Sequence, residues 1–238
     1  MLIFLESVAI ITLITVVLYL LLSHQQTQRA LIWWNSRQWL KMYQEGEAIQ
    51  NGLLQESFVI RRNLEILSVD PSFRQQKQEQ YYLATMEKFH NSLKELSEYL
   101  SPAHIDDSLP LAIRHLLVKW ESRIPGLNLQ MELPNEWHHE LLFTSRFILM
   151  VLEELMQMTS SIFSSNLSIF VSLKTRGNFH ELTVKLADLK TAKQIYISNL
   201  PESDYLRRTF IFSTFGKCFC QHDDDAEIWY LQWENLDK

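Results

Sequence analysis

The sequence predicts an α+β protein with one N-terminal transmembrane helix, a helical hairpin that pairs into a dimeric four-helix bundle, and a C-terminal α/β sandwich. Three observations support this fold class. The first 22 residues are almost wholly apolar, the stretch to residue 105 has the pattern of two long helices, and the remainder mixes helical and strand periods. The expected domains are therefore 2–22, 23–105 and 106–238.

The N-terminal segment Leu2–Leu22 is apolar apart from Glu6 and three hydroxyl side chains. At about 20 residues it matches the hydrocarbon thickness of a bilayer. It lacks the basic start and the small-residue cleavage site of a signal peptide. We therefore expect a membrane protein with a single span.

Basic residues after the span indicate its orientation, and tryptophans lie close to them in the sequence. Arg29, Arg37 and Lys41 follow the span, whereas no lysine or arginine precedes it, so the positive-inside rule places the C-terminal part in the cytoplasm. The tryptophans soon after the span are interpreted as an interfacial belt or as helix packing; they are Trp33, Trp34 and Trp39.

Two helices should follow the anchor. The first carries a narrow apolar seam and ends before Pro71, because proline disfavours helical backbone in the preceding residue. Its seam residues are Ile49, Leu53, Ile60, Leu64 and Leu67. The second is expected over 73–100, with Leu83, Met86, Phe89, Leu93 and Leu96 on one face. Two antiparallel helices cannot bury such seams alone, so we expect dimerisation, with Leu53 between the protomers.

The C-terminal part should form helices on one face of a mostly antiparallel sheet. The pattern predicts helices over 110–124, 137–162 and 200–212, and strands over 127–133, 166–174, 180–187, 217–221 and 227–233.

Composition excludes some functions. The 238-residue chain has a net charge of −6 and no large basic cluster, so it shows no electrostatic footprint for nucleic acid. Its two cysteines, Cys218 and Cys220, fit a reducing compartment. Cys218, Cys220 and His222 alternate along one strand, but neighbours on one face are about 6.6 Å apart, too far for one zinc ion to gather all three. We expect no metal.

Three stretches, "IQNGLLQESFVIRRNLEI", "LPLAIRHLLVKW" and "ILMVLEELMQM", carry a family resemblance. The order of elements and these stretches resemble bacterial sensor histidine kinases. The first stretch is similar to the phosphoacceptor helix of the subfamily whose box reads His-Asp-x-x-x-Gln. The others continue the resemblance into a Bergerat-type ATP-binding domain. The resemblance covers roughly residues 44–234 and implies a dimerising hairpin followed by an ATPase-like sandwich.

The phosphoacceptor box departs from the family. The family histidine falls on Gln50 and the adjacent aspartate on Asn51. An amide nitrogen held in resonance is not a usable nucleophile, and an asparagine amide cannot accept a proton as a carboxylate does. We expect no histidine autophosphorylation. His90 and His115 lack a following acidic residue and are interpreted as ordinary partly buried or surface histidines.

The nucleotide site departs as well. The family's Glu-x-x-x-Asn helix aligns with Glu154 and Met158, and a thioether is a poor ligand for magnesium. Asp188 takes the position of the family's adenine-reading aspartate, but no phosphate-cradling glycines follow it. We expect no cofactor, and we expect Glu153, Glu154 and Asp188 to be solvated charges.

The glutamine of the family's phosphoacceptor box is retained in this sequence as Gln55. Asn51 and Gln55 are four residues apart and share a helical face. In the resembling family this glutamine orients water against the phosphoaspartate of a response regulator. Gln55 is therefore a candidate phosphatase residue, and the plainer interpretation is a solvated polar residue.

The sequence thus favours a membrane-anchored pseudokinase that works by protein–protein contacts with a response regulator or with a true kinase. It is expected to be a homodimer or a heterodimer with a kinase. One alternative is a response-regulator phosphatase that uses Gln55. The other is a single-span accessory or structural subunit of a membrane protein complex.

Overall fold

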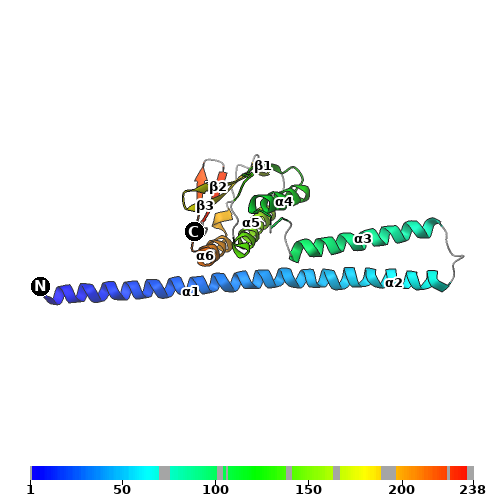
Figure 1. Ribbon diagram of the computed structural model, residues 1–238. Helices are drawn as coiled ribbons and strands as arrows, with labels where there is room; N and C mark the ends of the chain where they lie inside the picture. Colours follow the sequence, from blue (N-terminus) through cyan, green and yellow to red (C-terminus); the bar gives the residue numbers. More distant parts are fainter. Residues whose placement is uncertain are drawn as a thin grey trace. The chain divides into compact units, whose positions relative to one another are not determined.

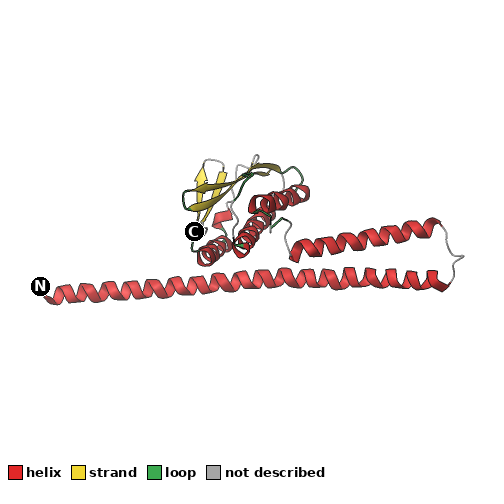
Figure 2. Cartoon of the chain, viewed as in Figure 1, coloured by secondary structure: helices red, strands yellow, loops and turns green. Residues whose placement is uncertain are grey.

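The computed structural model describes residues 2–69, 76–100, 104–105, 107–137, 141–162, 167–188, 197–223 and 226–234. Its helices and strands confirm the α+β class (Figure 2). The chain divides into two compact units, of which one joins Met1–Asn35 to His104–Lys238 and the other is Ser36–Ala103. Residues 23–35, which we expected to belong with the hairpin, thus group with the C-terminal body.

Helix α1 runs without a break from Leu2 to Ala48, well beyond the expected end of the span. It is long and apolar enough to cross a membrane, with a mean hydropathy of 1.5 in its most apolar stretch. The large apolar side chains from Ile10 to Leu22 are all exposed, between 46% for Val17 and 69% for Tyr19. Apolar residues that face outward all round suit a lipid environment.

The part of α1 after the span packs on the C-terminal body. Ala30 is 0% exposed and Trp34 is 7% exposed. The Trp34 ring lies 5.6 Å from that of Phe147, and the Trp33 ring lies 5.8 Å from that of Tyr205, measured between centroids. Of the two roles expected for this tryptophan pair, helix packing is the one observed.

The body contains a five-stranded sheet with the order β1-β2-β3-β5-β4. Its strands are β1 (Asn128–Glu132), β2 (Leu167–Arg176), β3 (Phe179–Asp188), β4 (Lys217–Asp223) and β5 (Ala226–Glu234). Strand β1 pairs parallel to β2, and the other pairs are antiparallel. The β2–β3 turn needs Gly177, whose φ of 63° lies in the left-handed region.

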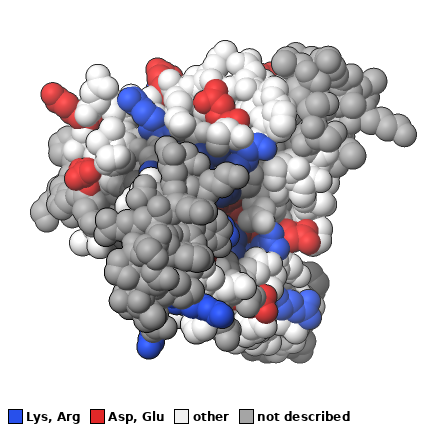
Figure 3. All heavy atoms as spheres, turned by 90° about the vertical axis from the view of Figure 1, so that its right-hand side faces the viewer, with Lys and Arg blue, Asp and Glu red and all other residues white. Residues whose placement is uncertain are grey.

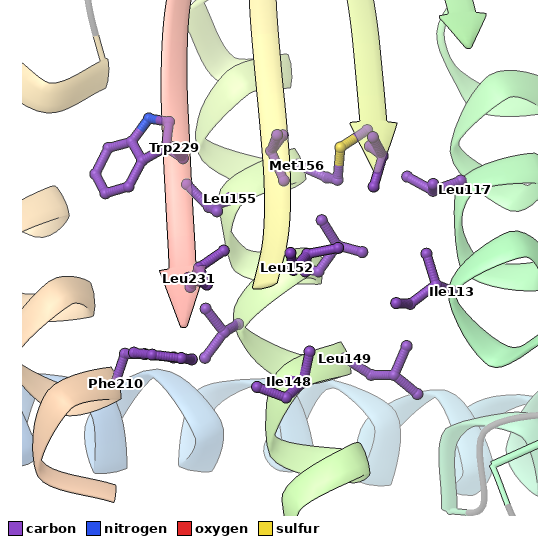
Figure 4. Close-up of a cluster of buried hydrophobic side chains, with 14 of the residues drawn as sticks. Ile113, Leu117, Ile148, Leu149, Leu152, Leu155, Met156, Phe210, Trp229 and Leu231 are labelled. Atoms are coloured by element: carbon purple, nitrogen blue, oxygen red, sulfur yellow. The ribbon is translucent and has the colours of Figure 1, made fainter. Parts of the chain in front are cut away.

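Three helices cover one face of this sheet (Figure 1): α4 (Leu109–Arg123), α5 (Leu142–Ile162) and α6 (Pro201–Thr214). Figure 4 shows the core between them, with Ile113 from α4, Leu152 from α5, Phe210 from α6 and Trp229 from β5. Leu152 and Phe210 are 0% exposed. Apolar side chains thus come from every layer of the fold, as expected for a single core.

Helix α5 begins at Leu142, later than the predicted residue 137. Trp137 instead packs on the buried ring of His180, with 4.5 Å between ring centroids. An apolar residue before a helix extends the apparent helical pattern, which explains why the sequence placed the start too early.

The hairpin unit contains α2 (Leu54–Val69) and α3 (Gln76–Leu100). Helix α2 is described as far as Val69; Asp70-Pro71, where we expected the helix to end, lies outside the described residues. Between α1 and α2 the chain forms a π-helical segment, η1 (Ile49–Leu53), where we expected a regular α-helix. Gly52 lies inside it, and glycine weakens a regular helix because of its backbone freedom.

Candidate functional site

The phosphoacceptor positions Gln50 and Asn51 fall within η1. Their side chains lie outside the described residues, so the shared face expected for Asn51 and Gln55 stays a prediction. A π-helical turn adds a residue to the helix and changes the direction of the side chains that follow it. Segments of this kind are frequent at functional sites.

The side chains that follow the π-helical segment differ in their exposure. Leu53 is 7% exposed within a single chain, so its burial needs no second protomer. Gln55 is exposed, and its amide is therefore available to a partner. Glu56 is 7% exposed and forms an ion pair of 2.8 Å with Lys88 on α3, whose side chain is solvated. The Ser92 hydroxyl also donates to Glu56, over 3.5 Å.

Both helices of the hairpin carry exposed apolar side chains, which together we call the apolar hairpin face. Its residues are Leu54 at 60%, Phe58 at 63%, Leu83 at 70%, Met86 at 52% and Leu93 at 42% exposed. Leu54 and Phe58 are one helical turn apart on α2, and Leu83 and Met86 are one turn apart on α3. Groups of exposed apolar side chains are frequent at contact surfaces.

The nucleotide positions on α5 are buried. Glu154 is 0% exposed and Met158 is 6% exposed, and their four-residue spacing puts them on one face of the helix. The expectation that Glu154 is a solvated charge is therefore wrong. The error has a local cause, because Glu153, which precedes it, is only half-buried, and sequence alone did not separate the two neighbours.

Asp188 is the last residue of β3. Its side chain and the segment 189–196 lie outside the described residues. Two residues earlier, Leu186 is opposite Glu227 of β5 in the sheet register. The backbone therefore places Asp188 at the same end of the sheet as Glu227.

Glu227 is the centre of a polar cluster that the sequence analysis missed. It is 3% exposed and accepts hydrogen bonds from the backbone N–H groups of Ile197 and Ser198, each over 2.7 Å. The Trp229 indole donates to it over 3.1 Å, and the Cys220 thiol donates over 3.4 Å. A buried carboxylate with four donors is well compensated for the loss of water.

The nearby thiols are held in the neutral form. Burial raises the pKa of Cys218 to about 12. Burial, with the charge of Glu227 and the hydrogen bond to it, raises the pKa of Cys220 to about 12. Thiolate is the form that binds metals and attacks electrophiles, so neither cysteine is activated for such chemistry.

The cluster also has the composition of a metal site. The ligand atoms of Cys220, His222 and Glu227 lie within 4.8 Å of one another, with Glu227 in the place that we had given to Cys218. However, Oε1 of Glu227 already accepts three hydrogen bonds, and Nε2 of His222 lies 3.0 Å from the Ser198 hydroxyl. This arrangement is best explained as a structural latch that fixes Ile197 and Ser198 to the β4–β5 hairpin.

The signal that would have revealed the latch is strand register. Glu227 begins the predicted strand 227–233, and in the structure it lies directly opposite His222 of β4. Figure 3 shows another property of the surface: on the face it presents, basic and acidic side chains are interspersed. Among the described residues on this face, charges of the two signs therefore lie close together.

No family model matches the chain, and no curated protein matches it. The solved structures to which it is similar include AdeS, a histidine kinase of Acinetobacter baumannii. The two chains are 10% identical, the match covers 78% of this chain and 98% of AdeS, and the TM-score is 0.43.

Two further structures are similar. The catalytic domain of the histidine kinase ThkA is 16% identical over 51% of this chain and 88% of its own, with a TM-score of 0.41. The blue-light activated histidine kinase of Erythrobacter litoralis is 10% identical over 78% of this chain and 59% of its own, with a TM-score of 0.44. These structures are histidine kinases, the class of protein that the sequence resembles.

Proposed function

We propose that this chain is a membrane-anchored, histidine-kinase-like pseudokinase that acts in signalling through protein–protein contacts. The observation that carries the proposal is the apolar hairpin face, which leaves large side chains such as Phe58 and Leu83 exposed on the segment that resembles a dimerisation hairpin. Burial of such side chains against a partner is the main source of stability in a helical bundle.

The chemistry of the two catalytic boxes argues against kinase activity. Gln50 offers no nucleophile, and Asn51 offers no base. Met158 supplies a thioether where magnesium needs an oxygen, and it is buried among apolar residues. A histidine-kinase-like chain with these residues can still change signal output by occupying a response regulator or by pairing with a true kinase.

The partner on the apolar hairpin face is a second copy of this chain or a related kinase hairpin. Glu56 and Lys88 link α2 to α3 within one chain, which keeps the two halves of this face in register. The body is proposed to lie in the cytoplasm, because the basic residues Arg29, Arg37 and Lys41 follow the span.

A second candidate function is a response-regulator phosphatase. The observation that favours it is the exposure of Gln55 beside the buried Glu56. An amide can orient an attacking water without any ionisable group, so this activity needs neither ATP nor a histidine.

The test uses the full chain in lipid nanodiscs, incubated with a panel of phosphorylated response regulators. Binding and the rate of dephosphorylation are measured for wild type, for Gln55→Ala and for the double variant Phe58→Glu, Leu83→Glu. We expect Gln55→Ala to keep regulator affinity and to have no effect on phosphate loss. The double variant should abolish pairing with a second hairpin.

Two outcomes would overturn the proposal. If regulator dephosphorylation is fast and Gln55→Ala abolishes it with affinity intact, the protein is a phosphatase. If no regulator or kinase binds and the chain instead copurifies from membranes in a stoichiometric complex that survives the Phe58→Glu, Leu83→Glu change, the accessory-subunit alternative holds.

A further inference from the structure

The C-terminal end of α6 exposes aromatic side chains. Phe215 is 90% exposed, and Phe212, one helical turn earlier, is 54% exposed. Phe215 also caps α6 with a φ of 52°, in the left-handed region where glycine is the usual residue. A phenylalanine at this position is strained and gains no packing from the described body, so its presence calls for another cause.

The residue after Phe215 is Gly216, and here a glycine is required by the close packing. A side chain on Gly216 would overlap the carbonyl oxygen of Gln232 on β5. The α6–β4 connection is therefore held close against the sheet, and the Phe215 ring is directed away from the core. The backbone that carries the exposed Phe215 ring is thus held in place.

Contacts with α1 show which way α6 runs. The Tyr205 ring packs on Trp33, and the Thr209 hydroxyl donates to the carbonyl of Ala30 over 3.4 Å. As α6 advances from residue 205 to 209, its contact on α1 steps back from residue 33 to 30. The C-terminal end of α6 therefore lies toward the N-terminal part of α1, where the apolar span is found (Figure 1).

The distances fit a bilayer surface. Ala30 lies eight residues after Leu22, which is about 12 Å along the helix. From Thr209, α6 continues toward the span for about 9 Å to Phe215, and the headgroup layer adds roughly 5–8 Å outside the hydrocarbon. The rings of Phe212 and Phe215 are thus within reach of the headgroup layer.

We infer that Phe212, Phe215 and Lys217 form a membrane-contacting surface on the body. The rings enter the boundary between headgroups and acyl chains, where aromatic residues are favoured, and the exposed Lys217 faces anionic headgroups. The occupant is lipid because the contacts of Tyr205 and Thr209 with α1 direct this end of α6 toward the apolar span. The inference rests on the proposed membrane anchoring by α1.

Such a surface would attach the body to the membrane at a second point. Because the body packs on α1, the span alone leaves α1 and the body free to rotate together in the bilayer, whereas the α6 contact fixes which face of the body meets the headgroups. Changes in lipid charge or packing would then change the contact between the body and the membrane directly.

The experiment uses the full chain in nanodiscs of mixed zwitterionic and anionic lipid. Single nitroxide labels are placed at Phe215→Cys, at the control Asn199→Cys beyond the other end of α6, and at Leu18→Cys in the span. The background carries Cys218→Ala and Cys220→Ser, and its thermal melt is compared with wild type. Collisions with oxygen report lipid, and collisions with a water-soluble nickel chelate report solvent.

We expect the labels at 18 and 215 to collide mainly with oxygen and the label at 199 mainly with nickel. A solvent-exposed label at 215 with a lipid-exposed label at 18 would overturn the inference and leave the anchor standing. Solvent exposure at both 18 and 215 would overturn the anchor and the inference together.

A second measurement needs no cysteine. Photolysis of diazirine-bearing lipid in nanodiscs with unsubstituted protein should attach lipid to the peptide that contains residues 211–217. Phe212→Ser with Phe215→Gly should reduce this attachment at least several-fold without lowering thermal stability, because glycine suits the left-handed backbone at 215. Attachment at the wild-type level in that variant would contradict the inference.

Discussion

Glu227 is a single buried carboxylate that joins β5 to the backbone of Ile197 and Ser198. We expect Glu227→Ala to lower the free energy of unfolding by roughly 2–4 kcal/mol, because it strands buried N–H donors. Glu234→Ala, at an exposed site on the same strand, is the matched control and should change little. Chemical denaturation of both variants checks this. If the two variants have the same free energy of unfolding, Glu227 does not fix Ile197 and Ser198 to the sheet.

The two thiols give a second prediction at the residue scale. Because their pKa values are raised from 9.0 to about 12, the neutral thiol is favoured in the folded chain. Folding stability should therefore be unaffected below pH 9 and should fall as the pH rises toward 12. A thiol-specific disulfide reagent at pH 8 should react slowly with the native protein and rapidly after unfolding; fast native reaction would show that a thiol is activated.

The helical hairpin shows what the sequence pattern predicts about a structural element and what it does not predict. The presence of two helices is predictable from the apolar pattern, and both are found as α2 and α3. Which seam residue faces which neighbour was not predictable, since Leu53 is buried within one chain and the adjacent Leu54 is exposed. The π-helical segment η1 also changes the register, and its hydrogen bonds leave no mark in the apolar pattern.

A pair of substitutions separates these two faces. Leu53→Ala should destabilise the hairpin by about 2–5 kcal/mol, because it leaves a cavity in one chain. Phe58→Glu should leave thermal stability of the monomer intact and abolish pairing with a second hairpin. Single-molecule photobleaching in nanodiscs and thermal melts read out the two effects. Pairing that survives Phe58→Glu and fails only with Leu53→Ala would show that the wrong face is assigned.

The site was less predictable than the sheet for a similar reason. The positions of the strands followed from alternating patterns, but the order of the strands did not, and the neighbours of Glu227 come from β4, β5 and the residues before α6, which meet only in three dimensions. Likewise, the burial of Glu154 depends on how α5 faces the sheet, which a pair of adjacent glutamates does not indicate.

At the scale of the whole molecule, we propose one span in the membrane with the body after it in the cytoplasm. Protease added to right-side-out cells should spare the C-terminal body, and permeabilised cells should lose it. The reason is the excess of Arg29, Arg37 and Lys41 after the span. Efficient digestion in intact cells would reverse the orientation.

We propose that this histidine-kinase-like chain works without kinase chemistry. The direct measurement is calorimetry with Mg-ATP on the full chain in nanodiscs, followed by phosphate transfer from radiolabelled ATP, for wild type and for Gln50→His with Asn51→Asp. We predict no magnesium-dependent binding and no phosphorylation of either protein, because restoring the nucleophile does not restore an oxygen ligand at Met158. Micromolar, magnesium-dependent ATP binding, or phosphorylation of the double variant, would contradict the account.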